Sequence, residues 1–110
     1  MSDISKLTAL KGFIGAAQFS EDGKLVAKAG QVDDKVGLML ADLCSANMRM
    51  GAMQAHGFST FSGMPGFEEC KGFALSGSAV SLCVFENLSV LVENSECDFN
   101  EVYKTLKAIV

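Results

Sequence analysis

The side chains best suited to chemistry in this sequence are four cysteines and a single histidine. No two cysteines are spaced as C-x-x-C, so the sequence carries no zinc-ribbon or thioredoxin-type motif. Cys44 and Cys83 lie within apolar segments, and we interpret them as small buried hydrophobic residues. Cys70 and Cys97 lie near the predicted ends of elements, where a thiol can be exposed.

The histidine, His56, precedes Gly57, which we expect to end a helix. A protonated imidazole at that place would face the negative end of the helix dipole. The sequence holds no G-x-S-x-G, H-E-x-x-H, phosphate-loop or dinucleotide-binding motif. We therefore predict no catalytic residue, no enzyme activity and no cofactor.

Methionines form the other unusual group, with Met48, Met50, Met53 and Met64 close together in the sequence. Thioether and thiolate sulfur atoms are ligands that suit Cu(I). Met48 and Met50 would point about 200° apart on a helix and could not share one ion, whereas Met50 and Met53 could. Adaptable packing is the more common use of such residues, so we predict no metal site.

Most of these residues belong to one apolar stretch, from Val32 to Gly57, which predicts a helix of about 22 residues. Asp33 is the expected N-cap and Gly57 the expected end. One stripe of this helix is apolar, and it is widened on one side by Cys44, Met48, Gly51 and Ala55. The stripe consists of Val36, Met39, Leu40, Leu43, Ala46, Met50 and Met53. Polar residues are confined to a narrow strip of Asp34, Lys35, Asp42, Ser45 and Arg49.

The apolar arc of this helix is about twice the 100° that packing on one face of a sheet requires. A helix of this kind must be covered on more than one side. In a short chain the economical cover is a second copy, although a central helix enclosed within one monomer would also satisfy the pattern. Asn47 and Gln54 lie within the arc and could fix the register of a helix pair, or could bond to backbone within the monomer.

The remaining segments predict an α+β fold in which a five-stranded, mostly antiparallel sheet packs against the long helix and two shorter terminal helices. Ala79–Phe85 is the most apolar strand and is expected at the centre of the sheet. The small residues Gly15, Ala16 and Ala17 are expected to leave room for the long helix. The expected segments are a short helix at 4–10, strands at 12–19 and 24–29 joined by a turn, a loop at 58–69, strands at 71–76, 79–85 and 88–93, and a closing helix at 99–110.

Composition limits the classes of function. A chain of 110 residues with 49% hydrophobic and 20% charged residues is expected to form one globular domain over residues 1–110. Its net charge of −4, with scattered Lys and Arg, argues against nucleic acid as a partner. No apolar run approaches the length needed to span a bilayer, and the first residues do not resemble a signal peptide, so we expect a cytoplasmic protein without membrane insertion.

The segment GFIGAAQFSEDGKLVA, followed by a long apolar helix, three strands and a closing helix, resembles the roadblock/dynein light chain superfamily, which has a profilin-like fold. The segment from Met48 to Phe58 resembles, in particular, a functionally unassigned prokaryotic branch of that superfamily. The resemblance covers nearly the whole chain. The loop Gly63-Met64-Pro65-Gly66 departs from the pattern just before the pairing strand, and no GTPase-contacting motif can be mapped onto this sequence.

The resemblance implies a non-enzymatic scaffold or regulator that dimerises and often acts beside a small Ras-like GTPase. In this family the long helix pairs with its mate and a middle strand continues the sheet across the two-fold axis. Those elements correspond here to residues 36–53 and 71–76. The implied dimer interface consists of Val36, Met39, Leu40, Leu43, Ala46, Asn47, Met50, Met53, Gly72, Phe73 and Ala74.

A second function fits the same sequence. A pocket between the helix and the sheet could hold a small molecule, or Cys70 or Cys97 could report on redox state. This alternative would make the chain a small-molecule or redox sensor.

Overall fold

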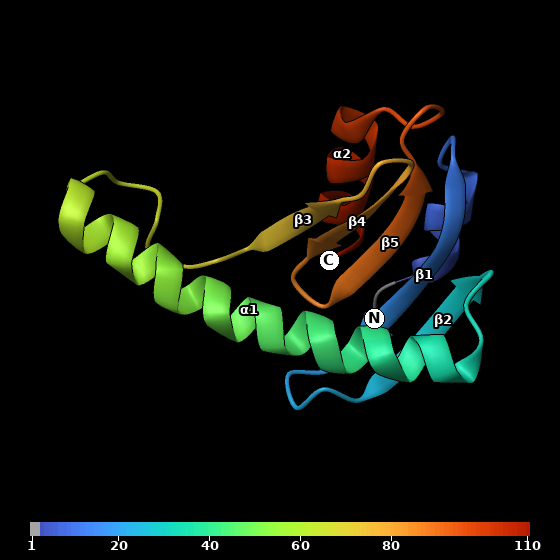
Figure 1. Ribbon diagram of the computed structural model, residues 1–110, viewed down its shortest axis with the longest axis horizontal. Coiled ribbons are helices and arrows are strands. Elements are labelled where there is room, and N and C mark those ends of the chain that lie inside the picture. Colours follow the sequence, from blue (N-terminus) through green and yellow to red (C-terminus); the bar gives the residue numbers. More distant parts are fainter. Residues whose placement is uncertain (1–2) are drawn as a thin grey trace.

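The protein is described by a computed structural model that covers residues 3–110. A short 3-10 helix opens the chain where a short helix was predicted, two strands and a long helix follow, and three strands lead to the last helix (Figure 1). The elements are η1 (Ile4–Ala9), β1 (Phe13–Phe19), β2 (Leu25–Gly30), α1 (Asp34–Ser62), β3 (Gly72–Ser76), β4 (Val80–Phe85), β5 (Leu88–Glu93) and α2 (Phe99–Ile109).

The five strands form one antiparallel sheet in the order β2-β1-β5-β4-β3. The predicted α+β fold with a five-stranded sheet is therefore confirmed. The prediction that residues 79–85 form the central strand is wrong, because β5 holds that place between β1 and β4. Four of the six residues of β5 are completely buried, namely Leu88, Ser89, Val90 and Val92.

Helices cover both faces of the sheet, and each face has its own core. On one face η1 and α2 pack against Ala16, Cys83, Leu88, Val90 and Val92. On the other face α1 packs against Ala17, Phe19 and Val84. The prediction that small residues of β1 leave room for the long helix holds for Ala17, which lies in the same buried cluster as Leu40 and Cys44 of α1. It is wrong for Ala16, which lies in the opposite core beneath η1 and α2 because successive residues of a strand face opposite sides.

The start of α1 follows the predicted capping rule, because the carboxylate of Asp33 accepts a hydrogen bond from the Val36 amide at 2.8 Å. The predicted end is wrong, since the helix continues through Gly57 to Ser62 and ends at Gly63. Gly63 has φ +67° and its amide donates to the Ser59 carbonyl, whereas Gly57 keeps helical geometry and faces open space. A glycine within a helix costs only about 1 kcal/mol relative to alanine, so it does not by itself end one.

The length of α1 exceeds the width of the sheet that it crosses. Its 29 residues correspond to about 44 Å at the usual helical rise. Five strands at a spacing of about 4.8 Å span only about 19 Å. The second half of α1, with the connection back to β3, therefore projects past the β3 edge as an arm, seen at the left of Figure 1. We call residues 51–71 the arm.

The two edges of the sheet differ in character. β2 forms one edge, and the Lys28 ammonium there donates to the Val32 carbonyl at 3.0 Å and pairs with Asp34 at 3.3 Å. β3 forms the other edge and carries no charged side chain between Gly72 and Ser76. Alternation along β3 places Phe73 and Leu75 on the α1 face, and Gly72, Ala74 and Ser76 on the α2 face.

None of the helices within residues 3–110 is both long and apolar enough to cross a membrane.

Candidate interaction surface

The outer face of α1 exposes a row of large apolar side chains. Met39 and Leu43 are each 51% exposed, Met50 is 57% exposed and Met53 is 76% exposed. All four belong to the predicted interface set, and all four lie on the side of α1 that the sheet does not cover. We call these four residues the outer row.

Other members of the predicted interface lie elsewhere. Leu40 is only 4% exposed and Val36 packs beside it, so both belong to the monomer's own core and not to a free face. The reason is that the sheet covers one part of the continuous apolar arc of α1. The sequence alone does not show which part faces the sheet and which part faces away from it. Ala46 is half-buried, and Asn47 is exposed. Gln54 is exposed too, so neither of the two amide side chains is buried within the monomer.

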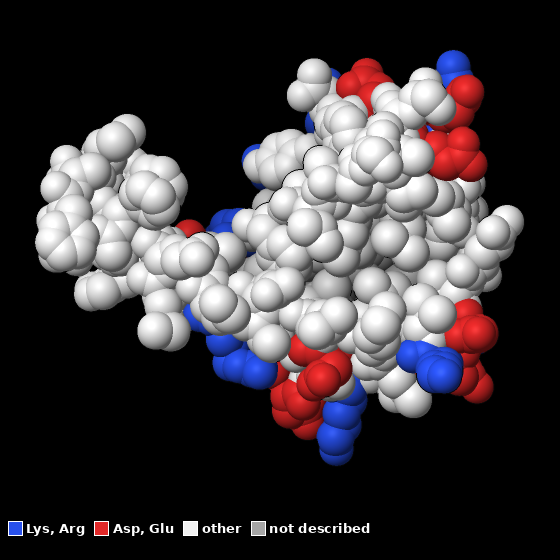
Figure 2. Space-filling model, in the orientation of Figure 1, with Lys and Arg blue, Asp and Glu red and all other residues white. Residues whose placement is uncertain are grey.

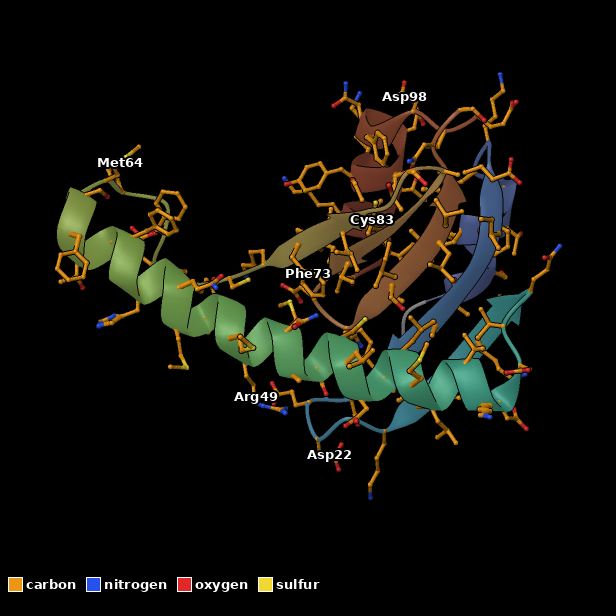
Figure 3. All side chains as sticks on the ribbon, viewed as in Figure 1. Asp22, Arg49, Met64, Phe73, Cys83 and Asp98 are labelled. Carbon is orange, nitrogen blue, oxygen red and sulfur yellow. The ribbon has the colours of Figure 1, made fainter. Side chains whose placement is uncertain are left out.

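Most of the arm, residues 51–67, carries no charged side chain. No Asp, Glu, Lys or Arg occurs between Met50 and Phe67. Figure 2 shows this part as a white projection, while charged side chains gather on the body of the molecule. At its tip Phe61 is 92% exposed, and Phe58 stacks on Phe67 with ring centroids 5.3 Å apart. Met64 lies at the same end (Figure 3).

Sequence reasoning missed this apolar tip because it assigned residues 58–69 to a loop. The structure extends the helix to Ser62, so that Phe58 and Phe61 project from a helix surface. The signal that could have found it is the absence of charge over residues 50–67, which is unusual in a chain with 20% charged residues.

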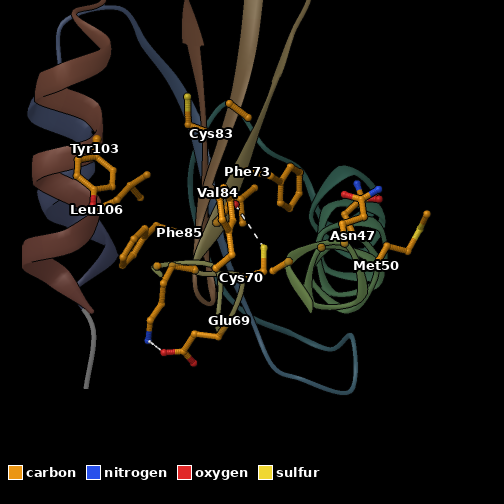
Figure 4. A pocket seen from close by; sticks show the side chains of 18 of the residues that line it. Asn47, Met50, Glu69, Cys70, Phe73, Cys83, Val84, Phe85, Tyr103 and Leu106 are labelled. Atoms are coloured by element: carbon orange, nitrogen blue, oxygen red, sulfur yellow. Dashed lines mark hydrogen bonds and ion pairs between the residues drawn. The ribbon is translucent and has the colours of Figure 1, made fainter. Parts of the chain in front are cut away.

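A groove of about 780 Å³ surrounds the β3 edge, between the arm, the sheet and α2. Figure 4 shows Phe73, Asn47 and Met50 on the α1 side of the strand, and Phe85 and Tyr103 on the α2 side. The predicted interface residues Gly72, Phe73 and Ala74 all line it. The groove thus joins the free strand edge to the outer row of α1 in one continuous surface.

α1 crosses the β3 edge close to its middle. A Cβ placed on Gly51 would lie only 2.5 Å from the sulfur of Cys70, so the absence of a side chain at Gly51 allows the connection to pass close to the helix. The thiol of Cys70 in turn donates to the Gly72 carbonyl at 3.5 Å. Residues 47–51 therefore mark the place where α1 leaves its own sheet.

The polar strip of α1 meets the turn between β1 and β2. The Arg49 guanidinium donates to the Glu21 carbonyl at 3.3 Å, and Figure 3 shows Arg49 near Asp22 of the same turn. Ser45 is buried, and its Oγ would lie 3.0 Å from a Cβ on Gly23. These contacts fix the rotation of α1 on the sheet and so turn the outer row to solvent.

The cysteines are free thiols. Cys44 and Cys83 are buried as predicted, and burial raises the pKa of the Cys44 thiol to about 11 and raises that of Cys83 as well. A thiol with a raised pKa is a poor nucleophile near neutral pH. Cys70 and Cys97 are half-buried.

His56 does not lie at the end of a helix, because α1 continues beyond it, and the proposed role at the helix C-terminus is therefore wrong. Its side chain is exposed within the arm. Among residues 3–110 there is no group of three or more His, Cys, Asp or Glu residues placed to hold a metal ion.

Comparison with known protein families gives one match, to the family described as "Uncharacterized conserved protein (DUF2173)", over residues 3–108. The chain belongs to the DUF2173 family. No curated protein matches this DUF2173 chain.

Solved structures resemble this DUF2173 chain in fold at low sequence identity. A roadblock/LC7 domain from Streptomyces avermitilis has a TM-score of 0.81 at 15% identity, and the match covers 96% of this chain and 85% of that one. MglB from Myxococcus xanthus has a TM-score of 0.69 at 20% identity over 88% and 76% of the two chains. A structure described as MglB with tetrameric arrangement has a TM-score of 0.74 at 16% identity over 96% and 76%. The predicted roadblock-type fold is confirmed.

Proposed function

We propose that this chain is a homodimerising, non-enzymatic module that acts as a scaffold or regulator of another protein. The observation that carries the proposal is the exposed outer row of α1 together with the uncharged residues 51–67 of the arm. Monomeric soluble proteins rarely expose a continuous apolar surface of this extent. A second copy would cover it with an identical surface, as two-fold symmetry requires.

The dimensions of the chain support a second copy as the cover. α1 exceeds the width of its sheet by about 25 Å, since about 44 Å of helix crosses about 19 Å of sheet. That excess is enough to cross one further five-stranded sheet. Each arm would then lie across the other copy, alongside the first half of its α1.

The free β3 edge supports the same arrangement. No strand pairs with its outer side within residues 3–110, and an uncharged edge strand readily accepts another strand. Antiparallel pairing of two β3 strands would join the sheets and place the two α1 helices side by side. The interface would include Met39, Leu43, Met50, Met53 and the α1-facing side of β3 near Phe73.

The partner class follows from the roadblock resemblance, which points to small Ras-like GTPases. The fold, and the tetrameric arrangement of the MglB structure, support a module that works through protein contacts. The cytoplasm is the proposed location.

The sensor alternative has one supporting observation, the groove of about 780 Å³, a volume that suits small-molecule sites. In the proposed dimer the second copy would occupy much of this groove. Native mass spectrometry separates the two functions, because a sensor would carry a bound small molecule and a scaffold would show polypeptide only.

The decisive experiment is the mass in solution, measured by light scattering coupled to size exclusion at micromolar concentration. Twice the chain mass of 11.6 kDa is expected. A mass equal to one chain would refute homodimerisation. If the dimer is found, its effect on nucleotide hydrolysis by a Ras-like GTPase tests the partner class, and an unchanged rate together with no binding would refute that assignment.

A further inference from the structure

The α2 face of β3 is not covered by any helix in the monomer. The side chains there belong to Gly72, Ala74 and Ser76, which are all small, and α2 packs against β4 and η1 instead. The flank of α2 that faces this strip carries Phe99 and Tyr103, which are 46% and 51% exposed.

The aromatic flank is held in place by packing. Tyr103 meets Phe85 of β4 edge to face, with ring centroids 5.6 Å apart. Phe85 pairs with Gly72 of β3, and because glycine has no side chain, the surface of β3 lies below the Phe85 ring there. Lys107 continues the flank, with its ammonium 5.8 Å from the centre of the Tyr103 ring. Within residues 3–110 no carboxylate lies within 4 Å of the Lys107 ammonium.

We propose that two α2 flanks and the small-residue faces of two paired β3 strands form a trough that binds an amphipathic helix of another protein, one with an apolar stripe and acidic residues beside it. This inference rests on the homodimer proposed above. It concerns the opposite face of the joined sheet from the α1 pair.

The width of the trough favours a helix as the occupant. α2 packs on β4 and also on the buried residues of β5, so the two α2 helices would stand three to five strand spacings apart, about 14–24 Å. A helix that packs about 8–10 Å from each neighbour needs about 16–20 Å between the two walls, and it can rest there on the small residues of the floor. An added strand has no place there, because both β3 edges would already be paired.

The charge of the rim favours acidic residues on that helix. Within residues 3–110 Lys107 forms no ion pair with a carboxylate, and symmetry would place one Lys107 on each wall. The aromatic side chains of α2 and the small residues of β3 would contact the apolar stripe of such a helix. The Lys107 ammonium on each side would face glutamate or aspartate beside that stripe.

The test uses a fluorescein-labelled synthetic peptide of 18 residues, helical, with leucine along one stripe and glutamate on both flanks. Fluorescence anisotropy measures its binding to the full chain, and light scattering measures the chain's mass in the same buffer. Saturation at one peptide per two chains is expected, with amide shift changes in Ala74, Phe85 and Tyr103. A counterpart with lysine in place of glutamate is expected to bind at least fivefold more weakly.

Variants identify the site. Tyr103→Ala and Phe99→Ser are each expected to weaken peptide binding tenfold or more while the mass remains that of a dimer. Lys107→Glu is expected to weaken it severalfold, and the matched charge reversal Lys11→Glu, on the turn before β1, is expected to leave it unchanged. Because Phe99 and Lys107 are surface residues, these variants keep the test valid if Tyr103→Ala fails to fold.

The two proposals fail in different ways. A dimer that does not bind the peptide, or binds it equally well after Phe99→Ser and Lys107→Glu, overturns the trough and leaves the dimer standing. Amide shifts confined to α1 overturn it as well. A chain that is monomeric by light scattering overturns the dimer first, and the two-walled trough falls with it.

Discussion

Shortening Leu43 to alanine tests the outer row of α1. Fully burying a leucine side chain contributes about 1.5–3 kcal/mol, and Leu43 is 51% exposed in the monomer, so covering the rest in a dimer is worth about 1 kcal/mol per copy. Two-fold symmetry uses the residue twice. Leu43→Ala should therefore weaken the dimer by about 2 kcal/mol, or roughly 30-fold in Kd, which sedimentation equilibrium can measure.

A charge at the same place should act more strongly. Leu43→Glu would bury two unpaired carboxylates in the helix pair, so the variant should be monomeric at micromolar concentration. Val26→Glu is the matched control, because Val26 on β2 is a similarly exposed aliphatic residue outside the proposed interface. Far-UV circular dichroism confirms the fold of each variant. The reasoning is refuted if Leu43→Glu keeps twice the chain mass, or if Val26→Glu is equally disruptive.

Three further predictions concern the monomer's own fold. In the Leu43→Glu background, Gly57→Ala should raise the free energy of unfolding by up to about 1 kcal/mol, whereas Gly63→Ala should lower it by a similar amount because of the φ of +67°, and urea unfolding would show both. Equal effects of the two would contradict the observed helix end. Leu88→Ala should cost about 2–5 kcal/mol, since the side chain is fully buried, and a loss under 1 kcal/mol would contradict that burial. The pKa of Cys44 is raised from 9.0 to about 11 in the folded state, so this contribution to stability should be complete below pH 9 and fall as the pH rises from 9 to 11, by about 3 kcal/mol at most. Cys44→Ala should reduce that pH dependence in urea titrations, and an unchanged profile would contradict it.

The elements that could be predicted are those whose signals are local. Alternating and helical periodicities located β2 and α2, and the side chain of Asp33 caps the helix that it was predicted to cap. The small size of Ala17 in β1 also predicted the close approach of α1. These features depend on a few neighbouring residues, so they can be recognised in the sequence alone.

The features that could not be predicted depend on contacts between distant segments. The place of β5 at the centre follows from its pairing with β1, about 70 positions earlier in the chain. The choice of Gly63 over Gly57 as the helix end depends on where the chain must turn back toward β3. The division of the apolar arc into Leu40, which is buried, and Leu43, which is exposed, depends on how the sheet and the β1–β2 turn orient α1.

The unequal edges of the sheet have a consequence for the size of any assembly. A sheet that could add strands at both edges would grow without limit into a fibre. Here only the β3 edge is free of charge, while the β2 edge carries Lys28, held by Val32 and Asp34. Joining two β3 edges uses up both sites of growth and leaves a protected strand at each end. In the proposed dimer, assembly would therefore stop at a finite number of copies, and the charge on β2 would set that limit.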